Sequence, residues 1–248
     1  MSTYCVYAIV APAAAAPRIR GLRGEQLQRV AFPHADAIVG RLSSAPRATS
    51  PTLRRYDEVV RALTARYPAI LPARFGTCVA DLAELEAVVR ARREAVTHAL
   101  RLVRNRVQMT VRVFRAEGSD RDAREPDTGG PEGPPLQIAA GAPGSPLEGA
   151  GTDRGGRGTK YLQARAAEEA AQRDVPEFRP LRPAVNRWIR GERVERRDAG
   201  TLAASVYHLI PRAAAAAYRR ALERAAHEAE VRVVVSGPWP PYAFAEIL

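Results

Sequence analysis

Histidines and glutamates recur on two helical segments at spacings that could bring metal ligands together. His98 lies four residues after Glu94, and His227 lies four residues after Glu223 and three before Glu230. A metal site needs several such ligands on one face, but His98 is surrounded by arginines that would repel a cation. Both groups are typical of charged helix surfaces. We therefore expect no metal site.

The two cysteines, Cys5 and Cys78, are the other candidates for chemistry. Neither belongs to a CxxC pair. Both lie in apolar segments, which favours buried, reduced thiols in a cytoplasmic protein. A disulfide would require the two segments to pair side by side, and the sequence leaves that alternative open.

Patterns typical of enzymes are missing from the sequence. It contains neither GxSxG nor HExxH. Residues 151–160 resemble a phosphate-binding loop, but they lack the Gly-Lys-Ser/Thr ending and a preceding apolar strand. We expect no catalytic residues, no cofactor and no small-molecule substrate, so the chain is not predicted to be an enzyme.

The charge of the chain is strongly basic, at +11. Its arginines are scattered among glutamates and form no compact stripe, so we expect no nucleic-acid partner. A basic nucleic-acid-binding module remains the alternative function. The sequence has no run of about 18 apolar residues, and we expect no membrane association.

A Gly- and Pro-rich stretch at residues 116–158 interrupts the hydrophobic pattern. Segments such as TGGPEGPP and GAPGSP cannot bury enough apolar surface to offset the entropy of ordering. The sequence predicts a flexible insertion here.

Before this insertion, the pattern predicts an N-terminal α+β domain over residues 1–105. Asp81 is a candidate helix N-cap, with Glu84 three residues later as in a capping box. The predicted strands cover residues 3–10, 35–39 and 73–79, and the predicted helices cover residues 53–67 and 82–103.

Residues 106–248 are predicted to form a second domain, which carries the insertion. Apolar residues alternate strictly over 106–113, as in a strand with one buried face. The remaining pattern predicts helices at 161–173, 181–189 and 211–229, and strands near Val194, at 202–210 and at 231–235. This order is ferredoxin-like, βαββαβ.

Two strings stand out as candidate interaction or domain-packing sites. In the first, LPARFGT, Arg74 precedes Phe75 and Gly76 on a predicted apolar strand. An arginine on such a strand needs a partner, and a buried carboxylate or a cluster of carbonyls would serve; Asp81 and Asp57 are candidates. Contact with another subunit or protein is the alternative.

The second string, SGPWPPYAF, is conformationally restricted. Its prolines fix φ and lack N–H donors, so we expect the chain to leave the preceding strand's ladder. The aromatic residues either pack over a sheet or between domains, or form an exposed surface for a partner. The candidate residues in this string are Gly237, Pro238, Trp239, Pro240, Pro241, Tyr242 and Phe244.

These strings carry a resemblance to a known family, the gas vesicle proteins GvpF and GvpL. The chain resembles the family in six features, in the same order along the sequence: a tyrosine-rich first strand, an LPxRFGT segment, a long helix, an alternating strand, a Tyr-Leu helix start and a terminal GPWPPYxF. Tyr161 and Leu162 form the Tyr-Leu pair here.

The resemblance implies a cytoplasmic accessory protein, associated with the gas vesicle and needed for its assembly. It implies as partners the small hydrophobic shell protein and other vesicle accessory proteins. Open sheet edges and the aromatic segment could cover the apolar surface of the shell subunit.

Overall fold

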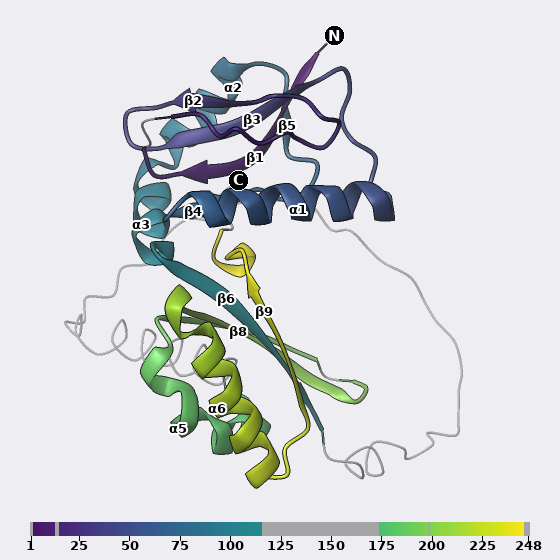
Figure 1. Cartoon of the computed structure of the whole chain (residues 1–248), viewed down its shortest axis with the longest axis vertical. Coiled ribbons are helices and arrows are strands. Elements are labelled where there is room, and N and C mark those ends of the chain that lie inside the picture. Colours follow the sequence, from purple (N-terminus) through teal and green to yellow (C-terminus); the bar gives the residue numbers. More distant parts are fainter. Residues whose placement is uncertain (1, 13–14, 116–173, 198, 246–248) are drawn as a thin grey trace, which may run out of the picture. The chain divides into compact units, whose positions relative to one another are not determined.

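The computed structural model of the chain describes residues 2–12, 15–115, 174–197 and 199–245. Residues 1–115 and 175–248 form one compact unit. This unit has mixed α/β architecture, with two antiparallel sheets and helices on their faces (Figure 1). The α+β class expected from the sequence is therefore confirmed at this level.

The first sheet is built around strand β1, Thr3–Val10, which pairs with β3 on one side and with β4 and β5 on the other. Six of its residues are buried, because helices cover both faces of the sheet. The other strands are β2 (Leu27–Ala31), β3 (Asp36–Leu42), β4 (Ile70–Pro72) and β5 (Cys78–Val79).

Helices α1 (Ser50–Arg66), α2 (Leu82–Ala91) and α3 (Arg93–Val103) bury the faces of this sheet. The apolar side of α1 shares one cluster with Tyr7 and Ile38, whereas α2 and α3 share another with Val6 and Ile9. The Asp81 carboxylate accepts a hydrogen bond from the backbone N–H of Glu84 at 2.8 Å, so the predicted N-cap is confirmed.

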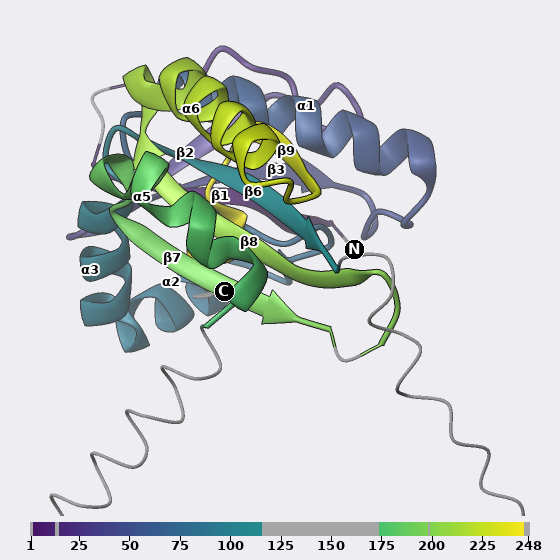
Figure 2. The same cartoon turned by 90° about the horizontal axis from the view of Figure 1, so that it is seen from below.

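The second sheet has the strand order β7-β8-β6-β9. Its strands are β6 (Arg106–Phe114), β7 (Gly191–Arg196), β8 (Leu202–Pro211) and β9 (Val233–Trp239). Helices α5 (Arg182–Val185) and α6 (Ala215–Glu228) cover one face (Figure 2). Four 3₁₀ turns accompany them: η1 (Pro176–Leu181), η2 (Asn186–Trp188), η3 (Arg212–Ala214) and η4 (Tyr242–Phe244).

The alternation predicted for residues 106–113 is found in β6. Val107, Met109 and Val111 are buried against the helices, whereas Thr110 and Arg112 point to the opposite face, which we call the helix-free face. The second sheet therefore has one apolar face, and its other face carries both polar and apolar side chains.

Two predictions for the first 105 residues are wrong, and one strand was not predicted. Residues 73–79 do not form one strand, because a turn at residues 74–77 separates β4 from β5. The helix predicted over 82–103 is broken at Arg92, whose φ of −108° and ψ of 21° are not helical. Strand β2 was not predicted.

The expectation of two free thiols is also wrong. Cys5 of β1 and Cys78 of β5 are directly opposite each other in the antiparallel register and form a disulfide. The two segments pair side by side, which is the condition that the sequence left open.

The predicted insertion at 116–158 and helix at 161–173, including Tyr161, lie outside the described residues. The domain division at residue 105 remains a prediction. Leu209 and Phe244 belong to the predicted second domain, and they lie in the same hydrophobic cluster as α2 and α3 of the predicted first domain.

Candidate docking site

The C-terminal string SGPWPPYAF begins inside strand β9. Its second residue, Gly237, is a glycine that the backbone requires. Gly237 has φ 113°, and a Cβ atom there would lie 2.8 Å from the backbone oxygen of Gln108. The peptide bond from Gly237 to Pro238 is cis. A side chain at position 237 would therefore collide with β6 as well as strain the backbone.

The prediction that the prolines end the ladder is wrong. Strand β9 continues to Trp239, which pairs with Gln108, and a register shift between Gln108 and Thr110 accommodates the irregular backbone. On the outer side of β9, the Arg219 guanidinium donates to the carbonyl oxygens of Val235 at 2.9 Å and Gly237 at 2.6 Å.

Beyond β9, the chain turns back onto the buried side chain of Gln108. The Gln108 Oε1 atom accepts a hydrogen bond from the backbone N–H of Ala243 at 2.8 Å. Pro240, Pro241 and Phe244 are buried in this turn. These three residues therefore serve packing in this conformation, and their side chains are not available to a partner.

Trp239 and Tyr242 are only partly buried and lie against helix α1. The Arg61 guanidinium carbon is 4.2 Å from the centroid of the Trp239 ring, a cation–π contact. Burial raises the pKa of the Tyr242 hydroxyl above its ordinary value; Asp57 raises it further and Arg61 opposes the shift. Both aromatic rings keep an accessible side.

The LPARFGT string forms the turn between β4 and β5. The N–H of Thr77 donates to the carbonyl of Arg74 at 3.1 Å, and Gly76 has φ 84°, as a type II turn requires. Phe75 contacts the ring of Tyr56 edge-on, with centroids 5.4 Å apart. Arg74 is exposed in this turn and does not lie on an apolar strand; its role in docking or packing remains a prediction.

A groove of about 530 Å³ runs along the helix-free face of the second sheet. Tyr207 lies within it, and its hydroxyl donates to the Glu195 carboxylate at 2.7 Å. The groove is lined by Gln108, Thr110, Arg112, Phe114, Glu195, Arg197, Leu202, Ser205, Tyr207, Ser236, Trp239 and Tyr242.

The groove mixes aromatic rings with arginine side chains, a combination typical of protein-binding surfaces. Among the described residues, no group of three or more histidine, cysteine, aspartate or glutamate side chains is placed to hold a metal. Within this same part of the chain, no helix has both the length and the apolar character needed to cross a membrane.

Comparison with known proteins identifies the family. The family model described as "Gas vesicle synthesis protein GvpL/GvpF" matches residues 3–246. The chain belongs to the GvpL/GvpF family. No curated protein matches it by sequence.

Two solved structures of GvpF are similar to this family member over its full length. The crystal structure of GvpF from Anabaena sp. PCC7120 has a TM-score of 0.65 and 14% identity, covering 100% of this chain and 98% of that chain. GvpF from Microcystis aeruginosa has a TM-score of 0.67 and 12% identity, covering 99% of both chains. At such low identity, these likenesses show the fold.

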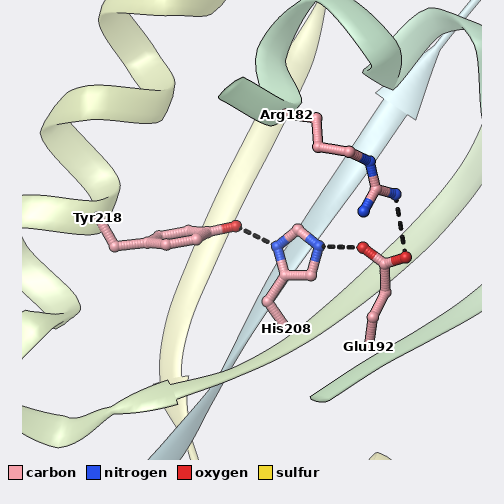
Figure 3. Close-up of polar contacts among 4 residues, drawn as sticks. All are labelled: Arg182, Glu192, His208 and Tyr218. Atoms are coloured by element: carbon pink, nitrogen blue, oxygen red, sulfur yellow. Dashed lines mark hydrogen bonds and ion pairs between the residues drawn. The ribbon is translucent and has the colours of Figure 1, made fainter. Parts of the chain in front are cut away.

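This GvpL/GvpF chain also contains a buried polar cluster on the helix-covered face, which the sequence analysis missed (Figure 3). His208 of β8 lies between Tyr218 of α6 and Glu192 of β7. Its Nδ1 atom is 2.5 Å from the Tyr218 hydroxyl, and its Nε2 atom is 2.8 Å from the Glu192 carboxylate. Arg182 of α5 donates to the other carboxylate oxygen at 3.0 Å.

Protonation states follow from this geometry. Burial lowers the pKa of His208, and Glu192 opposes that shift. A neutral imidazole satisfies both contacts, accepting from Tyr218 at Nδ1 and donating to Glu192 at Nε2. Burial alone would raise the pKa of Glu192, but hydrogen bonds from His208 and Arg182 lower it to about 2.

The cluster joins four elements and does not line the groove on the opposite face. Its role in the structure is to connect α5, α6, β7 and β8. One signal in the sequence could have revealed it: His208 interrupts the apolar run of β8, and a histidine there needs buried partners.

Proposed function

We propose that this protein is an accessory factor for the assembly of gas vesicles, acting in the cytoplasm in association with the vesicle and without enzymatic activity. The observation that carries the proposal is the GvpL/GvpF family match over residues 3–246. The full-length likeness to two GvpF structures supports it.

The second sheet fits a ferredoxin-like domain within this function. Numbered along the chain from β6, its strands have the order 2-3-1-4, and α6 connects the third strand to the fourth. This arrangement supports the inference of a C-terminal ferredoxin-like domain after an N-terminal α+β domain, with the boundary near residue 105.

The groove on the helix-free face is the proposed docking surface for the vesicle shell protein or other vesicle accessory proteins. Trp239 and Tyr242, both partly buried, line it together with Arg112. Among the described residues, the large apolar side chains that are exposed are Leu53 and Val234, and neither lines the groove. The groove brings aromatic and arginine side chains together on one surface.

Deleting the gene in a vesicle-forming host and restoring it on a plasmid tests this function. We expect deletion to abolish or malform vesicles, as seen by electron microscopy, and the plasmid to restore them. Purified protein should also retain the shell subunit or another vesicle protein in a pull-down assay. Normal vesicles in the deletion strain would refute the assembly role.

A further inference from the structure

We propose that the groove on the helix-free face binds an extended, acidic segment of a partner protein. This inference rests on the proposed function, because it names the chemistry of the segment that the docking surface accepts.

The first support is charge. Arg112 of β6 and Arg197, just after β7, both line the groove and are exposed. Among the described residues that line it, Glu195 supplies the single carboxylate, and this group already accepts a hydrogen bond from Tyr207. The groove therefore carries an excess of positive charge, which complements carboxylates spaced along a bound segment.

The second support is shape. The groove extends from Phe114 at one end of β6 to Gln108 and Trp239 at the other. The six steps from Gln108 to Phe114, at about 3.3 Å each, give a length of about 20 Å. This length accommodates about six residues of an extended segment, and the aromatic rings at both ends provide contacts for apolar side chains between the acidic ones.

The backbone of the groove floor limits how a segment can be held. Strand β6 pairs with both β8 and β9, so its backbone hydrogen-bonding groups are engaged in the ladders. A ligand on this face must therefore be recognised by side chains, which makes Arg112 and Arg197 the main source of selectivity.

A single-stranded nucleic acid fits the same surface less well. Stacking of bases needs free aromatic rings on the central strands. The central strands place two in the groove: Phe114 at the end of β6, whose ring lies under the Arg232 guanidinium, and Tyr207, whose hydroxyl donates to Glu195. A nucleic acid also carries a negative charge at every residue, so Glu195 would repel it. A peptide can place its carboxylates only where the arginines are.

Fluorescence anisotropy with the purified full chain tests the proposal. The probe is a fluorescein-labelled hexapeptide of alternating glutamate and leucine; a hexapeptide of alternating lysine and leucine and a labelled hexauridine RNA are the comparison ligands. We expect saturable binding of the glutamate probe, weakening as salt is raised, and no binding of the lysine probe. Tighter binding of the RNA, or no binding of the glutamate probe, would overturn the proposal.

A charge-matched pair of double variants locates the site. Arg112→Gln with Arg197→Gln should weaken binding of the glutamate probe by about tenfold. Arg220→Gln with Arg224→Gln removes the same charge from exposed positions on α6 and should leave binding unchanged. Equal weakening in both double variants would indicate unspecific attraction and overturn the site.

The vesicle assay separates this proposal from the proposed function. If the deletion strain lacks vesicles but the Arg112→Gln, Arg197→Gln variant restores them fully, the acidic-segment proposal is refuted and the assembly role stands. If the deletion strain forms normal vesicles, the assembly role itself is refuted. Circular dichroism of each variant checks that folding is retained.

Discussion

Replacing Glu192 with glutamine removes the charge from the buried cluster while keeping the size of the side chain. The carboxylate accepts hydrogen bonds from His208 and Arg182, and these lower its pKa from 4.5 to about 2. A carboxylate with a lowered pKa stabilises the folded state at any pH above its unfolded value of 4.5. That stabilisation is lost as the pH falls towards 2.

The size of the effect follows from the pKa change. At about 1.4 kcal/mol per pKa unit, the change corresponds to about 3 kcal/mol at pH 7. Glutamine can still accept one hydrogen bond, so we expect Glu192→Gln to lower the free energy of unfolding by about 2–3 kcal/mol at neutral pH.

Urea unfolding followed by circular dichroism at several pH values measures this difference. The gap between the parent and Glu192→Gln should shrink between pH 4.5 and 2. Glu192 raises the pKa of His208, so the loss of its charge also shifts the titration of the imidazole; the carboxylate is identified by the part of the gap that changes between pH 4.5 and 2. Glu195→Gln, an exposed position on the same strand, is the matched control and should change stability little. Equal stability of parent and Glu192→Gln at pH 7, or a gap that does not shrink in acid, would refute the reasoning.

Three further predictions concern packing and covalent structure. Gly237→Ala should lower the free energy of unfolding by about 2–4 kcal/mol, and Gly200→Ala, which has φ 82° but open space around its Cβ, by only about 1–2 kcal/mol; equal losses in urea melts would argue against the collision. Phe244→Ala should cost about 3–5 kcal/mol in the same assay because the ring is 6% exposed in a shared core, and a loss below 1 kcal/mol would mean that the ring is not packed there. Denatured protein should show no thiol reactive towards Ellman's reagent until it is reduced, after which Cys5 and Cys78 both react and stability falls by about 2–4 kcal/mol; two reactive thiols before reduction would exclude the disulfide.

Periodicity predicted the elements whose burial is regular. Strand β6 alternates along its length because one face packs on helices, and the run in β1 is almost wholly apolar because both faces are covered. The cap at Asp81 was also predictable, since it depends on residues three apart in the sequence.

Contacts between distant residues escaped the sequence analysis. The turn after Arg74 depends on the pairing of β5 with β1, and the continuation of β9 through Pro238 depends on a register shift in its pairing with β6. The groove likewise combines β6, the region of β7 and the C-terminal turn. Local propensity carries no information about such partners.

The position of Arg219 has a consequence for how copies of this chain meet. Its guanidinium donates to the carbonyl oxygens of Val235 and Gly237 on the free side of β9. Two of the acceptors that an incoming strand would need are therefore already engaged, which disfavours edge-to-edge pairing along this border. In a solution that also contains polymerising subunits, this edge of the second sheet is therefore a poor template for a further strand.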